Sequence, residues 1–397
     1  MIHRALAPSL EKLASQFPVV TLLGPRQSGK TTLTRMVFPD YAYVNLELPK
    51  YRHLAASDPE LFFNMNPAPL IIDEVQHVPE LLSHIQVFVD ENKRAGLFIL
   101  TGSHQPRLRA GVSQSLAGRT ALLTLLPLSI AELSRAGIDL SRDDYLFRGF
   151  LPRIHDQQLP PERVYEDYYR TYVERDVRQL VNLNNQFAFE VFVKLLAGRV
   201  GQVVNLQSLA GDVGVSATTL SSWLSVLEAS FIVFRLPAYY NNFGKRMLKA
   251  QKIFFTDVGL AAHLLGIASP KQAARDPLVG GLFENLVVLE AVKARYNTGC
   301  PADLYYLRNK TGAEIDLILD RARTLHLFEI KSAMTPDASY TRHLQRFSRD
   351  ISAVASSAVI YSGGNWPGSQ GISFVNFKET ERVILEKDEK PHRCVRL

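Results

Sequence analysis

The sequence predicts an α/β protein in which a parallel sheet domain is followed by a mainly helical module and a mixed α/β domain. Between residues 19 and 132, short apolar runs alternate with helical segments, a pattern typical of a parallel sheet that is buried on both faces. From about residue 160 to 265 amphipathic helices precede two strand-like runs. From about residue 277 one helix precedes further strand-like runs. The expected domains are 1–160, 161–270 and 271–397.

The composition sets wide limits on function. The chain has 397 residues, of which 46% are hydrophobic and 21% charged, as in ordinary globular proteins. A net charge of +6 permits a polyanionic partner such as nucleic acid without requiring one. Two cysteines are too few for a disulfide framework or a CxxC metal site, which fits a reducing cytoplasm. The most apolar stretch, 121–130, contains Pro127 and is far shorter than the ~20 residues that span a bilayer, so we expect a cytoplasmic protein that does not enter membranes.

The first domain contains five predicted strands and a glycine-rich loop. The strands are residues 19–23, 42–46, 70–72, 97–101 and 121–126. The loop after the first strand reads Gly24-Pro25-Arg26-Gln27-Ser28-Gly29-Lys30-Thr31, followed by Thr32 and a helical pattern. This is a complete phosphate-binding P-loop, in which backbone N–H groups and a helix N-terminus meet a phosphate chain. The strand before it and the helix after it argue against a chance match.

The P-loop predicts ATP and Mg²⁺ as the cofactors. Gly24 and Gly29 supply backbone freedom, Lys30 is expected at the β- and γ-phosphates, and the Thr31 hydroxyl is expected to ligate Mg²⁺. Two acids, Asp73 and Glu74, end the strand 70–72. We expect Asp73 to hold Mg²⁺ through water and Glu74 to polarise the attacking water. The alternative is that these acids cap the helix after Pro79, but two adjacent acids at the end of an apolar strand fit hydrolysis better.

The next strand ends in the polar segment Thr101-Gly102-Ser103-His104, and the segment Ala117-Gly118-Arg119 precedes the last strand. With these segments, the chain resembles prokaryotic AAA+ ATPases whose core carries a long C-terminal extension. The P-loop and the LIIDEVQ, LTGS and AGR segments follow the order of that family. The resemblance implies Thr101 or Ser103 as the first sensor, Arg119 as a candidate arginine finger, and a homo-oligomer such as a hexameric ring. A surface or DNA-contacting arginine is an equal alternative for Arg119.

Residues 205–227 have the spacing of a helix-turn-helix, with Gly214 in the turn and Ser216 as a cap. The strand-like runs 231–240 and 252–256 would form a hairpin, and the family resemblance also implies a winged helix. The second helix exposes no Arg or Lys, so sequence-specific reading of bases is not expected.

The hairpin combines basic and aromatic residues. Its predicted nucleic-acid contacts are Lys245, Arg246, Lys249 and Lys252, beside Tyr239, Tyr240 and Phe243. Such charges pair with phosphates while the rings stack on bases, which favours binding to the DNA backbone or to junctions. The alternative is a solvated basic hairpin over a small aromatic core.

The last domain carries acids that could converge on one pocket. Glu284 lies on a predicted helix, Asp316 in the strand 314–319, and Glu329 with Lys331 on the strand 325–330, where residues two apart share a side. These residues resemble the D and ExK elements of the restriction-endonuclease-like fold, which implies metal binding by Glu284, Asp316 and Glu329 and a water oriented by Lys331. A structural role for the same residues, without cleavage, is the alternative.

Together these observations predict an AAA+ ATPase that acts on DNA, branched or unwound, with an additional metal-dependent nuclease activity. The alternative is a nucleotide-switched binding or regulatory scaffold whose nuclease-like domain cuts nothing.

Overall fold

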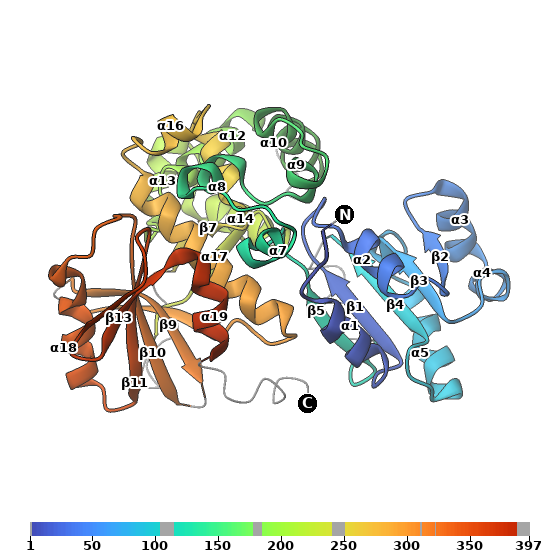
Figure 1. Cartoon of the computed structure of the whole chain (residues 1–397). Coiled ribbons are helices and arrows are strands. Elements are labelled where there is room, and N and C mark those ends of the chain that lie inside the picture. The colour runs from blue at the N-terminus through green and yellow to red at the C-terminus, as the bar shows by residue number, and fades with distance from the viewer. Residues whose placement is uncertain are drawn as a thin grey trace.

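The computed structural model describes residues 2–103, 115–177, 185–239, 251–309, 312–321 and 323–386. Three sheets of five, six and two strands organise these residues. The five-stranded sheet forms a lobe of its own, the six-stranded sheet forms a second, and helices of the middle region lie between and above them (Figure 1). Among the described helices, none is both long and apolar enough to cross a bilayer.

The first sheet has the strand order β2-β3-β4-β1-β5, and all of its neighbouring strands are parallel. The strands are β1 (Val19–Leu23), β2 (Ala42–Asn45), β3 (Leu70–Asp73), β4 (Phe98–Gly102) and β5 (Thr120–Thr124). The five predicted strands are therefore confirmed, with ends that differ by at most two residues. The sheet is covered by α1 (Ala7–Ala14), α2 (Lys30–Val37), α3 (Pro49–Ser57), α4 (Pro59–Met65) and α5 (Leu81–Asn92).

Alternate residues of each strand enter different cores. Val20 and Leu22 pack with Leu10 of α1, whereas Val19 and Leu23 pack in the larger cluster that continues into the rest of the chain. A strand directs successive side chains to opposite faces, so a strand that is apolar throughout must be covered on both sides. The carboxyl ends of all five strands meet at one edge of the sheet, where the P-loop lies.

The middle region is mainly helical. Its helices are α7 (Ile130–Arg135), α8 (Arg142–Arg148), α9 (Pro152–Asp156), α10 (Pro161–Tyr168), η2 (Tyr169–Val177), α12 (Gln186–Ala197), α13 (Leu206–Val213), α14 (Ala217–Ala229), α15 (Val258–Leu264) and α16 (Pro270–Ala273). The strands β6 (Val233–Leu236) and β7 (Lys252–Phe255) pair antiparallel, as predicted. The predicted helix pair is present as α13 and α14, and the Ser216 hydroxyl accepts from the Thr219 N–H at the start of α14.

The last region places a mixed sheet beside a long helix. The sheet order is β12-β13-β11-β10-β9-β8, with β10, β11 and β13 parallel and the other pairs antiparallel. The elements are α17 (Val279–Asn297), β8 (Leu304–Arg308), β9 (Glu314–Arg321), β10 (Thr324–Lys331), α18 (Arg342–Asp350), β11 (Val354–Tyr361), β12 (Trp366–Ser369), β13 (Ile372–Asn376) and α19 (Thr380–Glu386). The predicted helix that carries Glu284 is present as α17, and the predicted strands 314–319 and 325–330 are present as β9 and β10.

Helix α17 is the element that the three regions share. It contacts β5 in the first region, α8, α15 and β7 in the middle region, and β10 and α19 in the last (Figure 1). The amide of Asn285, which is fully buried, bonds both the N–H and the carbonyl of Phe255 at the end of β7, at 2.6 and 2.9 Å. A helix in this position can hold the regions in a fixed arrangement.

The packing of α8 and α9 against α10 and α15 within the middle region depends on Gly149, whose φ is 60°. A β-carbon at this residue would overlap the Tyr165 hydroxyl and the Asp257 carboxylate. Asp257 is buried and accepts from the N–H groups of Phe150 at 3.0 Å and Gly259 at 2.9 Å.

Gly149→Ala should therefore lower the free energy of unfolding by about 2 kcal/mol or more, because it adds a steric overlap to an unfavourable backbone conformation. Gly137→Ala is the matched control, since Gly137 is also left-handed but has open space around its β-carbon position. The control should lose about 1 kcal/mol. Urea unfolding of both variants measures the difference, and equal losses would contradict the steric argument.

Candidate functional site

The P-loop joins the end of β1 to the start of α2. Gly24 passes so close to β5 that a β-carbon would overlap the carbonyl oxygen of Leu125. A side chain is therefore excluded at this position, which accounts for the first glycine of the motif. Gly29 directly precedes Lys30, the first residue of α2.

Lys30 is held across its own loop. Its side chain is buried, and Nζ donates hydrogen bonds to the carbonyl oxygens of Gly24 at 3.0 Å and Pro25 at 2.8 Å. Burial lowers the pKa of Lys30, while the carboxylates of Glu74 and Asp73 oppose that effect. The ammonium group thus lies against the backbone of the P-loop, where the charges of the acids at the end of β3 act on it.

Asp73 connects the ends of four elements. Its Oδ2 accepts from the hydroxyls of Thr31 and Tyr43, each at 2.8 Å, and its Oδ1 accepts from the hydroxyl of Thr101. The side chain is only 2% exposed, so these hydroxyls replace the water that a carboxylate would otherwise need. Tyr43 was not predicted, since nothing in its local sequence marks it. Burial, together with Asp73, raises the pKa of the Tyr43 phenol.

Glu74 adopts a left-handed conformation with φ 56° and lines the cavity described below. Its Oε2 accepts from the Ser103 hydroxyl at 3.1 Å and from the Gln76 side-chain amide. The alternative role of the two acids in capping the following helix is wrong, because α5 has Glu80 at its N-cap position. Thr101 and Ser103, the two predicted sensors, thus each contact one acid. Gln76, in the short 3-10 helix Val75–His77, was not predicted because a single amide at such a position has no signature in sequence.

A cavity of about 500 Å³ adjoins the P-loop. One wall consists of P-loop and α2 residues, including Arg26, Gln27, Gly29, Thr31, Thr32 and Met36. The facing wall comes from α9 and η2 and includes Arg153, Gln157 and Tyr172. The Arg26 guanidinium lies over the Tyr172 ring at 5.6 Å from its centroid, which connects the two walls. The predicted P-loop residues are therefore brought together, but the residues of the facing wall were not predicted because they come from a different region of the chain.

Arg119 lies at the other edge of the sheet. It directly precedes β5, which runs parallel to β1 with Thr120 opposite Val19, whereas the P-loop follows the far end of β1. A five-residue strand spans about 16 Å, so Arg119 does not reach the P-loop of its own chain. Its guanidinium pairs with Asp90 at 2.6 Å on the surface.

The acids predicted in the last region do converge, together with two lysines. Lys331 Nζ lies 2.5 Å from Glu329 Oε1 and 3.5 Å from Asp316 Oδ2. Lys252 Nζ lies 2.7 Å from Glu284 Oε1 and 3.8 Å from Asp316 Oδ1, and it also pairs with Glu314. Burial raises the pKa of Glu284 and of Glu329. Within the described ranges, no three His, Cys, Asp or Glu side chains are arranged as a metal site.

The prediction that Lys252 contacts nucleic acid is wrong. Its side chain is only 3% exposed and points into the acid cluster. Burial alone would lower the pKa of Lys252, but the carboxylates of Glu284, Asp316 and Glu314 raise it. Lys252 follows a run of basic residues in sequence, whereas its partners in the structure are more than 30 residues away. The other predicted contacts, Lys245, Arg246 and Lys249, lie outside the described residues, as do Tyr240 and Phe243.

Three family models match successive parts of the chain. Residues 16–134 match an AAA domain, residues 140–271 a domain of unknown function (DUF8612), and residues 279–379 another domain of unknown function (DUF4143). The AAA match contains the P-loop, both acids at the end of β3, and both predicted sensors. The first region is therefore an AAA-type P-loop ATPase domain.

Relatives match most of the chain. An uncharacterized protein of Mycobacterium tuberculosis is 32% identical over 365 residues, which are 91% of this chain and 80% of the relative. The chain belongs to the same family as this protein. An uncharacterized protein of Mycobacterium bovis matches with the same figures, and one of Haemophilus influenzae is 25% identical over 77% of this chain and 80% of its own.

Two solved structures are more distantly similar. A Walker-type ATPase of Pyrococcus abyssi is 16% identical with a TM-score of 0.40, over 65% of this chain and 94% of its own. AMPPCP-bound DnaA from Aquifex aeolicus is 15% identical with a TM-score of 0.29, over 56% and 85%. Both TM-scores lie below 0.5, so neither similarity bears on function.

Lys252→Met should lower the free energy of unfolding by about 3–5 kcal/mol, because it leaves buried carboxylates without their cation. The double variant Lys252→Met/Glu284→Gln should recover part of that loss, since one of the unpaired charges is removed. Lys271→Met, at an exposed position of the middle region, is the control and should change little. Chemical unfolding measures all three variants, and a loss equal to that of the control would contradict the buried ion pairs.

Proposed function

We propose that this protein binds ATP with Mg²⁺ in the cavity at the P-loop and hydrolyses the ATP. The observation that carries the proposal is the contact of Thr31 with Asp73 beside the buried Lys30. A hydroxyl and a carboxylate 2.8 Å apart are hard oxygen ligands of the kind that Mg²⁺ prefers, so these two residues fit the ion. A cavity of about 500 Å³ also lies in the range of small-molecule and cofactor sites.

Each residue then has a separate task. The backbone from Gly24 to Thr32 binds the phosphates, and Lys30 neutralises the charge on their terminal oxygens. Glu74, which faces the cavity, orients the attacking water and accepts its proton. Mg²⁺, when bound, supplies charge stabilisation at the phosphate oxygens.

Of the two candidate sensors, Ser103 fits better. Its hydroxyl contacts Glu74, and Glu74 lines the cavity. Thr101 is fully buried and donates to Asp73, so its hydroxyl is already used in holding that carboxylate. We infer that Ser103 responds to the γ-phosphate through Glu74, whereas Thr101 maintains the position of Asp73.

Lys30→Ala should abolish ATP binding, because it removes the charge that pairs with the phosphates. Glu74→Gln should still bind ATP but turn it over about 100-fold more slowly or worse, because the amide cannot accept a proton. Equilibrium binding of a fluorescent ATP analogue and steady-state phosphate release test the pair. Normal turnover in both variants would exclude the ATPase proposal.

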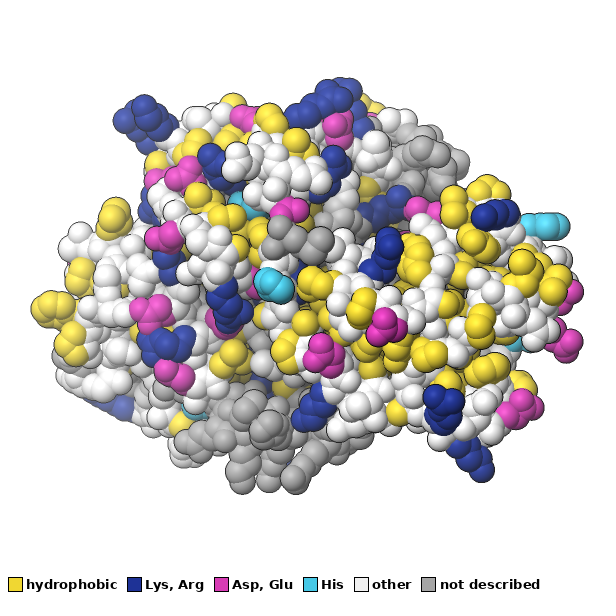
Figure 2. All heavy atoms as spheres, turned by 45° about the vertical axis from the view of Figure 1, so that its right-hand side comes forward, with side chains coloured by type: hydrophobic (Ala, Val, Ile, Leu, Met, Phe, Trp, Pro, Cys, Tyr) yellow, Lys and Arg dark blue, Asp and Glu magenta, His cyan; other side chains and the backbone are white. Residues whose placement is uncertain are grey.

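We further propose that the protein assembles into a homo-oligomer in which Arg119 acts on a neighbouring copy. Two observations support this: Arg119 cannot reach its own P-loop, and large apolar side chains are exposed over the first domain. These side chains are Leu48, Leu61, Met65, Val87 and Leu122, and apolar groups are frequent on this side of the molecule (Figure 2). Specific activity should then rise with protein concentration. A protein that is monomeric by light scattering and still fully active would exclude this role of Arg119.

We propose that the partner is DNA, bound through its backbone by the segment between β6 and β7. The net charge of +6 and the cluster of basic residues in that segment support the proposal.

Replacing Lys245, Arg246 and Lys249 together by Ala should weaken DNA binding and reduce its dependence on salt. Each lost phosphate contact lowers the slope of log affinity against log salt by about 0.9 on duplex DNA. The matched control replaces Arg163, Arg170 and Lys271, which are exposed in the same region and should leave the slope unchanged. An unaltered slope in the first variant would place the DNA elsewhere.

In the last region, a divalent cation bound by Glu284, Asp316 and Glu329 would have to compete with Lys252. Lys331 would orient a water at such a site. The ammonium groups of Lys252 and Lys331 already neutralise part of this cluster. That observation favours the second candidate function, a nucleotide-switched scaffold that cuts nothing. Calorimetry with Mn²⁺ on Lys30→Ala protein, together with DNA cleavage by wild-type and Asp316→Ala protein, separates the two. Metal binding and Asp316-dependent cleavage would establish the nuclease.

A further inference from the structure

The side chain of Arg4, close to the N-terminus, is built into the floor of the P-loop. Only 7% of this residue is exposed, and its guanidinium donates to the carbonyl oxygens of Ser28 and Leu126, the latter at 2.6 Å. Its Nε pairs with Glu132 at 3.0 Å. Arg4 also lines the cavity at the P-loop. It is thus one cation shared by the P-loop, the end of β5 and the start of α7.

The Ser28 carbonyl needs such a donor. Ser28 lies between Gln27 and Gly29, which both have positive φ angles, of 60° and 91°. A P-loop binds phosphate through its N–H groups, and its carbonyl oxygens must find partners elsewhere. Arg4 supplies the partner for Ser28, and a guanidinium is suited to this because its five N–H groups form a rigid fork.

Arg4 is itself held by Glu132. The carboxylate of Glu132 accepts from Arg4 and from the Ala5 N–H through Oε1, and from the Ser129 N–H through Oε2 at 2.8 Å. The Ser129 hydroxyl accepts from the Glu132 N–H in return, which completes a capping box at the start of α7. Glu132 is only 1% exposed, so the geometry of Arg4 depends on the position of α7.

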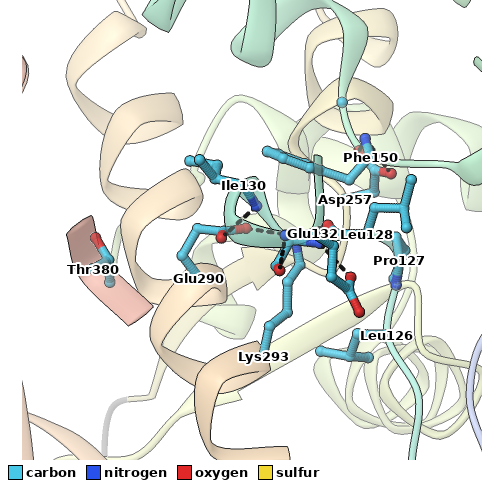
Figure 3. A network of polar contacts seen from close by, with 12 residues as sticks. Leu126, Pro127, Leu128, Ile130, Glu132, Phe150, Asp257, Glu290, Lys293 and Thr380 are labelled. Atoms are coloured by element: carbon cyan, nitrogen blue, oxygen red, sulfur yellow. Dashed lines mark hydrogen bonds and ion pairs between the residues drawn. The ribbon is translucent and has the colours of Figure 1, made fainter. Parts of the chain in front are cut away.

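Helix α17 in turn holds the segment 126–132. Glu290 Oε2 accepts from the Ile130 N–H at 2.8 Å, and Lys293 Nζ donates to the Leu128 carbonyl at 2.8 Å (Figure 3). Glu290 and Lys293 pair with each other at 2.8 Å, and both are 2% exposed. In Figure 3 both side chains extend from α17 toward the segment that contains Leu128, Ile130 and Glu132. A continuous set of buried polar contacts therefore joins α17 to the P-loop.

We propose that Arg4 is a positioning residue of the nucleotide site, and that α17 sets the position of Arg4 through residues 126–132. Arg4 fixes the Ser28 peptide and thereby the P-loop, while Glu132 and Glu290 act on the loop through Arg4. The last region of the chain thus contributes to the affinity for nucleotide although Glu290 and Lys293 do not line the cavity. The effect on nucleotide rests on the proposed ATP binding, but the effect on the loop does not.

Hydrogen exchange of the peptide that covers residues 24–31 tests the positioning directly. In Arg4→Gln, the amides of this peptide should exchange faster than in the wild type without any nucleotide present. Glu290→Gln should produce a smaller increase in the same peptide. Arg135→Gln is the matched control, because Arg135 lies on α7 like Glu132 but is 59% exposed and pairs with Glu381. It should leave the exchange unchanged.

ATP binding provides the second readout. Arg4→Gln should raise the Kd for ATP by about tenfold or more, the size expected for loss of a charged hydrogen bond, with kcat at saturating ATP within about threefold of wild type. Arg4→Lys should be intermediate, since one nitrogen cannot serve Ser28, Leu126 and Glu132 together. A variant that only loosened the fold would contain less active protein, which lowers the apparent kcat and leaves the Kd of the folded fraction unchanged.

Unchanged exchange of residues 24–31 in folded Arg4→Gln protein would overturn the positioning role. An effect of Arg4→Gln without any effect of Glu290→Gln would overturn the contribution of α17. If wild-type protein binds no ATP, the proposed function fails, and the exchange measurement still decides whether Arg4 holds the loop. Should Arg4→Gln not fold, Glu132→Gln and Glu290→Gln carry the same exchange test, with loss of protection expected in both.

Discussion

The buried carboxylate of Asp73 is the constraint on which the nucleotide site depends. Because it is almost fully removed from water, it must be satisfied by donors from the protein. Three hydroxyls meet this need, and they come from β2, α2 and β4. The hydrogen bond of Thr31 in this way joins the start of α2, the helix that begins with Lys30, to the end of β3. The same carboxylate that would serve a metal ion therefore also positions the P-loop.

Helix α17 has a comparable role on a larger scale. Three of its buried polar side chains form hydrogen bonds with backbone groups of other regions. Asn285 bonds the middle region, and Glu290 and Lys293 bond the segment after β5. Burying such groups is costly unless every one has a partner, so these contacts allow few alternative arrangements of the three regions. The mixed sheet of the last region packs against the same helix. The P-loop site and the last region are consequently connected through α17.

The acid cluster at the other end of α17 differs from the P-loop site in its counter-ions. At the P-loop, Lys30 bonds two backbone carbonyls and faces a cavity, so its charge is available to a ligand. In the cluster, Lys252 is only 3% exposed and is surrounded by carboxylates from α17 and β9. Lys30 is thus available to a ligand in the cavity, whereas Lys252 neutralises buried carboxylates. The P-loop motif identifies the role of Lys30 from its neighbours in sequence, whereas the role of Lys252 depends on partners more than 30 residues away.

The sequence by itself determined the order of the elements, the five parallel strands, the P-loop and the two acids that end β3. These features leave a local signature in the chain, namely apolar periodicity and a motif whose residues follow one another in sequence. Only the tertiary structure decided that Tyr43 and Gln76 support the acids, that α9 and η2 close the cavity, that Arg4 bonds the P-loop, and that Lys252 is buried. Gln76 lies two residues from Glu74, but its amide also reaches Ser103, which follows β4. The other contacts join residues from different elements, so their formation depends on how those elements pack rather than on the residues beside them in the chain.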